Sequence, residues 1–570
     1  MKKNKIPLTA LIMIALVIMS CKLLAQTTEP VAAQRAMVVC SDRNASEVGL
    51  KILKEGGNAM DAAVAMSFAL AVTYPGAGNI GGGGFIVYYR NDGTITSIDF
   101  REKAPLHSNP TMFLDKDGNI KNNSNHAGIL SVGVPGTVAG LELAHKKYGK
   151  LDWKKVVEPA VILAENGFRI SESLSGDIQY FKDALSKYPS SFKVFMKKDG
   201  TAYFPGEIWH QPDLAKTLKR IQKYGQKDFY EGETARLICE FMKNNGGIIN
   251  SDDLKKYKAI ERAPIHGTYR GYDVYTMGPP SSGGVVLTEM LNILEEYDLK
   301  TMGHNSVPYL HLLTEVMRLA YSDRARYLGD ADFNPDIPLK MMCSKEYASK
   351  LRNTIPMDQS SVSNPEDVEQ VSESAHTTHL SVIDRDGNAV SLTYTIERWF
   401  GCKIVVEGAG FVLNNEMGDF NPIPGRTDNL GHIGTKPNLI APEKRMLSSM
   451  CPTILLKDKR PFLIIGAPGG RTIPNTVLQV ILNTIDFNMN IAEAVSQKRI
   501  HHQWMPDTTC FEKDVFSDVT RNLFEKMGHK TKMDKNLPNC EAMGILIDNK
   551  KNIIYGAADP RSPDGLAAGY

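Results

Sequence analysis

Apolar residues recur along the first half of the chain at the spacing of helices that bury one face. Residues 45–54 form a short amphipathic run that stops at Gly56-Gly57, whereas residues 62–72 are apolar on every side, which is typical of a helix buried all round. Four glycines, Gly81 to Gly84, lead into a predicted strand at residues 85–89. The same spacing predicts helices at residues 137–147, 214–223, 233–244, 286–295 and 309–327.

The pattern changes near residue 377, where runs of β-branched and aromatic residues begin. Residues 378–384 and 389–395 flank Asp386-Gly387, a dipeptide that strongly favours a hairpin between two strands. Because strands and helices occur in both halves of the chain, the sequence predicts sheets packed between helical layers. Later strands are expected at residues 410–413, 453–456, 462–465, 543–547 and 553–555, and a later helix at residues 475–487.

The first 25 residues have the pattern of an export signal. A basic start, Met1 to Lys5, precedes the apolar residues 8–19, a run that is too short to span a bilayer comfortably. Cleavage after Ala25 is one expectation, and the other is a lipoprotein signal that makes Cys21 the lipidated first residue. A buried N-terminal helix is the structural alternative. We expect an exported protein, periplasmic or secreted, that meets a membrane only if Cys21 carries lipid.

Composition and charge exclude several classes of function. The 570 residues have a net charge of +2 and no long basic or acidic block, which argues against a nucleic-acid-binding surface. Eight cysteines in a chain of this length do not form a disulfide framework, and Cys40, Cys239 and Cys451 lie in apolar stretches typical of core residues. No further apolar run reaches about 18 residues, so the mature chain is not expected to cross a membrane. The expected partner is a small molecule.

Three short motifs suggest ligands but fail on their context. Residues 76–81 match G-x-G-x-x-G, yet a helix precedes them and a strand follows, the reverse of a dinucleotide site. Residues 115–118 and 384–387 lack the closing Glu of a calcium loop and are predicted as turns. His501-His502 has no partner at metal-ligand spacing. We therefore expect neither a metal nor a cofactor.

A nucleophile is the remaining candidate chemistry. Residues 360–374 are polar and acidic without periodicity, and they end near His376 and Thr377, directly before a predicted strand. A threonine that becomes a new N-terminus can attack, because its own α-amine accepts the hydroxyl proton. With a two-residue hairpin turn, Thr377 lies opposite residue 396, within one residue of Thr395. An ordinary strand residue is the alternative, since threonine is favoured in strands.

The run from Thr377 to Thr395 resembles the start of the small subunit of γ-glutamyltransferases. Other segments are similar to signatures of the same family, in the same order, from about residue 30 to Tyr570. These segments are residues 58–63, 78–84, 99–105, 279–284, 447–450, 466–470 and 559–561.

The resemblance implies an α/β (α+β) four-layer αββα sandwich of the N-terminal-nucleophile hydrolase type, with two stacked, mainly antiparallel sheets between helical layers. It implies an inactive precursor that cleaves itself between His376 and Thr377. A helix-rich large subunit, residues 26–376, and a small catalytic subunit, residues 377–570, would then form one intertwined fold. The implied activity is γ-glutamyl transfer and glutathione hydrolysis, with glutathione and other γ-glutamyl compounds as donors and amino acids or dipeptides as acceptors.

The resemblance also assigns roles to individual residues. Thr377 is implied as the nucleophile and Thr395 as its hydrogen-bond partner, while the amides of Gly469 and Gly470 would hold the oxyanion. The amino-acid end of the donor needs partners for a carboxylate and for an ammonium. Arg101, Ser448 and Ser449 match carboxylate-binding positions, and Glu416 and Asp419 match ammonium-binding positions. Glu397 is implied as a further substrate-binding residue.

Two of these positions depart from the common family pattern. Glu397 stands where many members have Asn, and Glu416 stands where others have Gln. Both add negative charge near a bound ammonium, and one of them is expected to stay protonated if they lie close together. Residues 423–445, rich in Gly, Pro and Asn, are long enough to form a lid over the pocket.

Two rival interpretations use the same scaffold. A β-lactam acylase that acts on glutaryl side chains is disfavoured by the acidic cluster of Glu397, Glu416 and Asp419, because a glutaryl group has no ammonium to pair. A catalytically silent surface lipoprotein is disfavoured because the nucleophile and oxyanion residues are all present.

Overall fold

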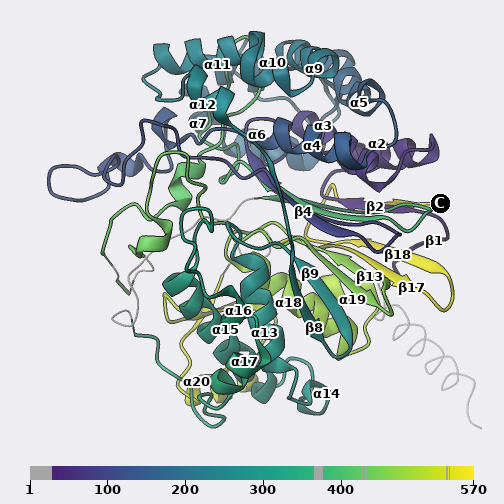
Figure 1. Cartoon of the computed structure of the whole chain (residues 1–570), viewed down its shortest axis with the longest axis vertical. Coiled ribbons are helices and arrows are strands. Elements are labelled where there is room, and N and C mark those ends of the chain that lie inside the picture. The colour runs from purple at the N-terminus through teal and green to yellow at the C-terminus, as the bar shows by residue number, and fades with distance from the viewer. Residues whose placement is uncertain (1–28, 365–376, 427, 430–432, 535–536, 538–539) are drawn as a thin grey trace, which may run out of the picture.

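The computed structural model describes residues 29–364, 377–426, 428–429, 433–534, 537 and 540–570. The expected signal segment with Cys21, and His376 with most of the acidic stretch before it, lie outside the described residues. Seen down the shortest axis, the chain forms four layers, with helices above, two sheets between and helices below (Figure 1). The predicted four-layer αββα sandwich, with two antiparallel sheets between helical layers, is confirmed.

The first sheet joins strands from distant parts of the chain. All its neighbouring pairs are antiparallel, and the two strands of the predicted hairpin, β10 and β11, lie at its centre. In spatial order the strands are β19 (Leu566–Gly569), β2 (Met37–Cys40), β10 (Thr378–Ile383), β11 (Ala389–Thr395), β3 (Gly83–Tyr89), β4 (Ile95–Asp99) and β7 (Ile260–Arg262).

The second sheet is also antiparallel throughout. Its order is β1 (Val31–Ala33), β18 (Ile553–Ala558), β17 (Met543–Asp548), β13 (Arg460–Ile465), β12 (Thr453–Lys457), β9 (Tyr272–Thr276) and β8 (Ile265–Tyr269). Two small sheets contain β14 (Ile500–His501), β15 (Thr509–Phe511) and β16 (Thr531–Met533), and β5 (Phe168–Arg169) and β6 (Ile208–Trp209).

Helices cover the outer face of each sheet (Figure 1). Those on the side of the first sheet include α2 (Arg43–Lys54), α3 (Ala59–Thr73), α4 (Thr137–Tyr148), α5 (Trp153–Asn166), α6 (Glu172–Tyr180), α9 (Pro212–Tyr224), α10 (Gln226–Glu231), α11 (Glu233–Asn244) and α12 (Ser251–Lys256). Those on the side of the second sheet include α13 (Gly283–Leu294), α15 (Val307–Tyr327), α17 (Lys345–Arg352), α18 (Thr472–Ile485), α19 (Ile491–Ser496) and α20 (Asp518–Lys526). The short helices α7 (Lys182–Ser186), α8 (Pro189–Phe195), α14 (Leu299–Met302) and α16 (Leu339–Met342) are the other α-helices within the described residues.

The helix that the sequence predicts to be buried all round is α3, and each of its side chains is buried. Asn58 and Asp61 start it with a capping box, in which each side chain accepts a hydrogen bond from the other residue's backbone amide. Because its sides contact α2, α4, α5 and β10, no polar face is needed. This helix anchors the helical layer to the centre of the first sheet.

The hairpin between β10 and β11 has a longer turn than the sequence suggested. Asp384 accepts hydrogen bonds from the amides of Asp386 and Asn388, which closes a loop of residues 384–388. Thr378 therefore pairs with Tyr394. The expected register was wrong by one residue, because a turn of two residues was assumed.

Two segments that contain glycine, residues 410–413 and 76–81, differ in how well the sequence predicts them. Residues 410–413 were expected as a strand of a sheet, which is wrong: Gly410 has a φ of +78°, and Val412 forms only a local bridge to Val405. Residues 76–81 connect α3 to β3, as predicted, and a Cβ on Gly78 would lie 2.3 Å from the carbonyl oxygen of Leu70. This close approach explains the glycine without any nucleotide.

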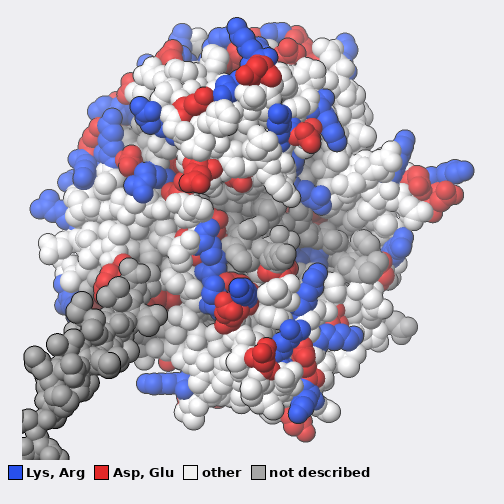
Figure 2. All heavy atoms as spheres, turned by 180° about the vertical axis from the view of Figure 1, so that it is seen from behind, with Lys and Arg blue, Asp and Glu red and all other residues white. Residues whose placement is uncertain are grey.

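The surface and the cysteines add two facts. Lys and Arg side chains are interspersed with Asp and Glu over the face shown in Figure 2, with no large patch of one sign.

Cys40 and Cys451 are buried, as expected for core residues, whereas Cys239 is only half-buried. The seven cysteines within the described residues are free thiols. None of the helices built from these residues has the length and apolar character needed to cross a bilayer.

Candidate active site

Strand geometry brings Thr377 and Thr395 to one end of the space between the sheets. Since Thr378 pairs with Tyr394, the next facing pair along the hairpin is Thr377 and Thr395. Side chains alternate along a strand, so both threonines share the face on which Ser381 contacts the second sheet. Thr377 is 5% exposed and Thr395 is 4% exposed. The two hydroxyl side chains therefore lie in a nearly closed environment.

The end of β11 is fixed by the loop between α3 and β3. Asn79 donates from Nδ2 to the carbonyl oxygen of Thr395 at 2.9 Å, and its own oxygen accepts from the amide of Gly82 and the hydroxyl of Thr137. A Cβ on Gly82 would lie 2.0 Å from the carbonyl oxygen of Thr395, so only glycine fits this approach. The amide of Glu397 donates to Oγ1 of Thr395 at 2.8 Å. Thr395 is thus held from both sides.

A buried polar layer lies below the two threonines, between the sheets. His379 contacts Thr393 Oγ1 at 2.8 Å through Nδ1 and Ser381 Oγ at 3.1 Å through Nε2. Ser381 donates to the carbonyl oxygen of Met543 on β17 at 2.9 Å. Burial lowers the pKa of His379 to about 3, so its ring is neutral. A Cβ on Gly466 would lie 2.3 Å from that ring, which means that the strand of Thr377 packs directly against the chain leaving β13.

Gly469 and Gly470 lie between β13 and the first turn of α18. Both have left-handed backbones, with φ of +129° and +58°, and Thr472 Oγ1 donates to the carbonyl oxygen of Gly469 at 2.7 Å. Their two amides donate to no partner among the described residues. Two N–H groups at a helix start form a favourable site for developing negative charge.

If the amides of Gly469 and Gly470 hold an oxyanion, as the family resemblance implies, Gly469→Ala is expected to lower the turnover number of the enzyme about 100-fold while the chain still folds. A Cβ at this position would lie 2.5 Å from Thr472 Oγ1 and 2.6 Å from Cys540 Sγ, so the amides must shift. Gly93→Ala is the matched control, because Gly93 also has a positive φ, +90°, but nothing lies within 4 Å of its Cβ position. Steady-state rates and thermal unfolding of both variants measure the effect. Equal losses of activity in the two variants would show that backbone strain alone is responsible.

Arg101 is a buried cation surrounded by three carboxylates. Its guanidinium lies 2.5 Å from Glu416, 2.5 Å from Asp419 and 3.3 Å from Glu102. Glu102 is a site residue that the sequence did not reveal, although it lies within a family-like segment. Burial raises the pKa of Glu102 to about 8 and raises the pKa of Glu416 well above its usual range. Glu416 and Asp419 make the two shortest contacts with the Arg101 guanidinium, and the charges of all three carboxyls raise the pKa of Arg101.

The two positions that depart from the family pattern turn their carboxylates toward protein groups. Glu416 is fully buried behind Arg101 and does not line the cavity. Glu397 lines the cavity, with its carboxylate hydrogen-bonded to Asn415 Nδ2 and 3.2 Å from Nδ1 of His126. The Glu397 charge also contributes to the raised pKa of Glu416, after burial and Glu102. The two carboxyls are thus close enough to affect each other.

Ser448 and Ser449 are placed by a segment far away in sequence. The amide of Ser448 donates to the carbonyl oxygen of Pro280 at 2.9 Å, and Ser282 donates back to the carbonyl oxygen of Ser448 at 2.7 Å. Arg324 on α15 donates to Ser449 Oγ at 3.1 Å and to Ser282 Oγ at 2.9 Å. The sequence indicated both segments, residues 279–284 and 447–450, but gave no sign that Arg324 joins them.

The predicted residues converge on one small cavity. Eight of the ten predicted catalytic and substrate-binding residues line it, Gly469 adjoins it through Gly470, and Glu416 lies behind Arg101. His376 lies outside the described residues. The lining is Arg101, Thr377, Thr395, Glu397, Asp419, Ser448, Ser449, Met450, Gly470 and Ile473.

The segment expected as a lid, residues 423–445, is fixed over its second part. Asn438 donates to the carbonyl oxygen of Asp419 at 2.7 Å and accepts from the amide of Leu447 at 2.9 Å. Arg445 is 1% exposed, and its amide donates to Asp330 at 2.8 Å. The second part of this segment therefore supports the cavity wall, and a lid over the cavity stays a prediction.

One group of side chains has the residue types of a metal site. His311, Glu315 and His529 are buried, and their potential ligand atoms lie within 4.8 Å of one another. The two rings already contact each other at 2.7 Å, and Glu315 accepts from Arg318 and from the amide of Ser361. Because a neighbouring guanidinium opposes a cation, hydrogen bonding explains this cluster without a metal.

Comparison with known proteins agrees with the geometry. The family model described as gamma-glutamyltranspeptidase matches residues 45–569. The chain is 44% identical to the glutathione hydrolase proenzyme of Escherichia coli (strain K12) over 544 residues, covering 95% of this chain and 93% of the relative. The crystal structure of cephalosporin acylase from Bacillus halodurans is similar with a TM-score of 0.82 and 27% identity, covering 95% of this chain and 97% of that chain. Helicobacter pylori gamma-glutamyltranspeptidase is similar with a TM-score of 0.55 and 47% identity, covering 56% of this chain and 91% of that chain. The chain belongs to the gamma-glutamyltranspeptidase family.

Proposed function

We propose that this chain is a γ-glutamyltransferase and glutathione hydrolase whose nucleophile is Thr377. One observation carries the proposal: Thr377, Thr395, Gly470 and the charged groups around Arg101 line the same small cavity, although they come from distant segments. A nucleophile, an oxyanion site and paired charges for an amino-acid group are the parts that cleavage of a γ-glutamyl amide needs.

The first reaction in this proposal acts on the chain itself. Thr377 Oγ attacks the carbonyl carbon of His376, the peptide bond rearranges to an ester, and water hydrolyses the ester. The products are a large subunit that ends at His376 and a small subunit, residues 377–570, that begins with a free α-amine. The name proenzyme carried by the Escherichia coli relative supports this step.

The freed α-amine then serves as the base for the second reaction. Its pKa of about 7.7–8.0 leaves a useful neutral fraction near neutral pH. It takes the proton of Thr377 Oγ while the oxygen bonds to the γ-carbonyl carbon of the donor. The amide C–N bond breaks, and the leaving amine departs with that proton. Water or another amine attacks the resulting γ-glutamyl ester and restores the hydroxyl of Thr377.

Thr395 and the amides of Gly469 and Gly470 are proposed to stabilise this reaction. Thr395 Oγ1 accepts a hydrogen bond from the amide of Glu397. In our proposal, Thr395 also orients the Thr377 hydroxyl by a hydrogen bond. The amides of Gly469 and Gly470 bind the oxyanion that forms when the carbonyl carbon becomes tetrahedral. Such donors act strongly because they are fixed before the charge develops, and one donor is often worth about 3 kcal/mol.

The α-amino-acid end of the donor is proposed to enter beside Arg101. Arg101 and Asp419 contact each other directly at 2.5 Å. A donor carboxylate on Arg101, with the hydroxyls of Ser448 and Ser449, and a donor ammonium on Asp419 replace this one ion pair by two. Glu397 adds a second negative charge to the same cavity. Direct binding of the ammonium by Glu416 remains a prediction that requires Arg101 to shift.

The location of the enzyme is part of the proposal. Residues 1–25 are proposed to direct export to the periplasm or the medium, with cleavage after Ala25 or lipid attachment at Cys21. Lipidation would tie the enzyme to a membrane. The large and small subunits cut from one precursor are proposed to stay bound to each other. The groups that act as nucleophile, base and oxyanion site in the steps above all belong to the chain.

Release of p-nitroaniline from its L-γ-glutamyl anilide tests the proposed function. Purified, cleaved protein is expected to release the chromophore, and added glycylglycine is expected to raise the rate where transfer competes with hydrolysis. A protein that is cleaved into its two subunits but releases no chromophore would overturn the proposal.

Removing the ammonium from the donor is expected to lower kcat/KM at least about 100-fold, as measured with glutaryl p-nitroanilide beside the γ-glutamyl compound. Without the ammonium, the acidic side chains of Asp419 and Glu397, which line the cavity, gain no cationic partner from the ligand. Asp419→Asn is expected to reduce the ratio of kcat/KM for the γ-glutamyl compound to kcat/KM for the glutaryl compound. The rival interpretation, a β-lactam acylase that acts on glutaryl side chains, predicts a preference for the glutaryl compound.

A further inference from the structure

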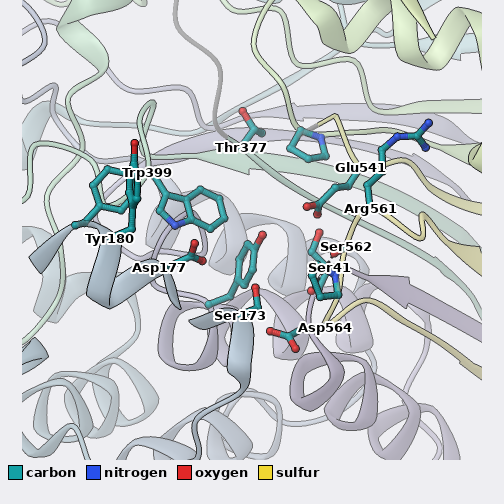
Figure 3. Close-up of a pocket in the computed structure, with 14 residues that line it drawn as sticks. Ser41, Ser173, Asp177, Tyr180, Thr377, Trp399, Glu541, Arg561, Ser562 and Asp564 are labelled. Atoms are coloured by element: carbon teal, nitrogen blue, oxygen red, sulfur yellow. Dashed lines mark hydrogen bonds between the residues drawn. The ribbon is translucent and has the colours of Figure 1, made fainter. Parts of the chain in front are cut away.

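Thr377 lines the small cavity and also a second cavity, of about 480 Å³, whose walls come from both ends of the chain. Figure 3 shows three carboxylates in the lining of the second cavity, those of Asp177, Glu541 and Asp564. In the same view the side chain of Arg561 points away from them. The wall of the small cavity contains the guanidinium of Arg101 and two serine side chains. The groups that suit the α-carboxylate of a γ-glutamyl donor therefore surround the small cavity.

A second buried arginine stands behind this wall. Arg324 lies in the last turn of α15, is 2% exposed and is not itself part of the cavity lining. Its Nη2 donates to Oγ of Ser449, which is a lining residue, at 3.1 Å. Its Nε donates to Oγ of Ser282 at 2.9 Å. Because a guanidinium group is planar and rigid, it holds these two hydroxyls in fixed directions.

Ser282 connects Arg324 to the other serine of the lining, Ser448. The hydroxyl of Ser282 donates to the carbonyl oxygen of Ser448 at 2.7 Å, and the amide of Ser282 donates to the same oxygen, also at 2.7 Å. Arg324 therefore contacts Ser449 directly and fixes Ser448 through Ser282.

Arg101 holds the other end of the same short run of chain. Its Nε donates to the carbonyl oxygen of Met446 and its Nη2 donates to that of Leu447, both at 3.3 Å. Residues 446–449 thus lie between two guanidinium groups from different segments. Arg101 is 0% exposed and Arg324 is 2% exposed, so solvent screens their charges little.

The contact with Arg324 also changes the hydroxyl of Ser449. A hydroxyl that accepts a hydrogen bond from a cation becomes a stronger donor, because neighbouring hydrogen bonds polarise one another. Since Ser449 lines the cavity, this effect and the positive charge behind it reach a carboxylate that binds there.

We propose that Arg324 is a positioning residue for the α-carboxylate of the donor. It orders Ser448 and Ser449 and places a second positive charge behind them. The inference rests on the proposed function, because it takes the small cavity as the site of the γ-glutamyl group. The α-carboxylate is remote from the bond that breaks, so its binding is the same before and during the reaction. Loss of Arg324 is therefore expected to raise KM rather than to lower kcat.

Three anilides that differ in the charges of their acyl group test this role. L-γ-Glutamyl p-nitroanilide has an ammonium and a carboxylate, glutaryl p-nitroanilide has only the carboxylate, and 4-aminobutanoyl p-nitroanilide has only the ammonium. Arg324→Gln is expected to raise KM for the γ-glutamyl compound about tenfold and to change kcat by less than about threefold. A cleaved Arg324→Gln protein that keeps the KM of the parent would overturn the inference.

Ratios between the donors separate the proposed role from general damage to the protein. Only donors with a carboxylate should respond to Arg324→Gln. The ratio of kcat/KM for the γ-glutamyl compound to that for the 4-aminobutanoyl compound should fall about tenfold, and its ratio to the glutaryl compound should stay within about twofold. Equal losses for all three donors would show a structural effect and would count against the inference. A parent protein that prefers the glutaryl compound would instead refute the proposed function.

Arg352→Gln is the matched control. Arg352 on α17 also joins two segments of this helical layer, because it donates to the carbonyl oxygens of Asn292 at 3.3 Å and Ile293 at 3.2 Å. It lines neither cavity, so KM is expected to stay within about twofold of the parent for all three donors. The same rise in KM in both variants would mean that the contact with Ser449 is not the cause.

A double-mutant cycle tests whether Arg324 acts through Ser449. In a Ser449→Ala protein, Arg324→Gln is expected to raise KM for the γ-glutamyl compound by less than about threefold, because their contact is already lost. Full additivity of the two substitutions would overturn this part of the inference.

Arg324→Lys keeps the buried charge and so provides a variant in which the fold is less disturbed. One ammonium group cannot reproduce the planar fork that holds Ser282 and Ser449, so KM for the γ-glutamyl compound is still expected to rise, by about threefold. Thermal unfolding and a denaturing gel check that this variant is folded and cleaved. A folded, cleaved Arg324→Lys protein with the ratios and the KM of the parent would show that the fork is not needed.

Discussion

Replacing Thr377 with alanine is expected to leave the chain uncut and to lower hydrolysis of the γ-glutamyl anilide at least about 10,000-fold. The same hydroxyl is proposed to cut the precursor and to attack the donor, so one substitution removes both steps. Denaturing electrophoresis should give one band for the variant and two bands for the parent. Initial rates of p-nitroaniline release measure the second loss.

The next residue on β10 provides a matched control for this experiment. Thr378 is fully buried, lies on the opposite face of the strand, and its hydroxyl has no hydrogen-bond partner among the described residues. Thr378→Val keeps the shape and removes an unpaired hydroxyl, so processing and activity are expected to stay within about twofold. A Thr377→Ala protein that is still cut at the same bond would contradict the proposed role of this residue.

Arg101→Met is expected to destabilise the fold by about 3–5 kcal/mol and to raise KM for the donor. The substitution leaves Glu102, Glu416 and Asp419 around a position without its cation, in a region that is almost inaccessible to solvent. Urea unfolding measures the loss of stability. Arg236→Met is the control, because Arg236 makes two ion pairs on the surface of α11, where water screens them and little change is expected.

The loss caused by Arg101→Met is expected to grow with pH. Arg101 lowers the pKa values of Glu102 and Glu416 in the folded chain. Without this cation, both folded pKa values rise still further above the values in the unfolded chain. A carboxyl with a raised folded pKa stabilises the fold at low pH, and this contribution is lost as pH rises through the folded value. Since the pKa of Glu102 in the parent is about 8, the difference between variant and parent should grow as pH rises above that value, and it should be larger at about pH 9.5 than at about pH 7. A difference that shrinks over this range would show that these carboxyls are not the cause.

Much of the central fold could be predicted because its signals are local. The apolar run that forms α3 and the residues of β11 have the periodicity of their element, and the expected bounds of β11 match the structure. The edge strands β1 and β19 were not predicted, since each is short and is formed by pairing with a distant partner. The error at residues 410–413 arose because an extended local bridge has the same composition as a strand.

In the candidate site, too, residues in continuous motifs could be predicted, whereas residues placed by contacts between distant segments could not. Gly469, Gly470 and Thr377 stand in motifs that can be recognised along the chain, and the register error of one residue did not separate Thr377 from Thr395. Glu102 and Arg324 act through contacts between distant segments, so no spacing in the sequence reveals them. The second cavity was also hidden, because its walls come from both ends of the chain.

The N-terminal sequence of the smaller fragment tests the central claim most directly. Purified protein is separated on a denaturing gel, and the smaller band is sequenced from its first residue and weighed by mass spectrometry. The account predicts a fragment that begins Thr-Thr-His-Leu, at Thr377, with the mass of residues 377–570 and a free α-amine. An active protein whose chain remains uncut, or whose smaller fragment begins at another residue, would contradict it.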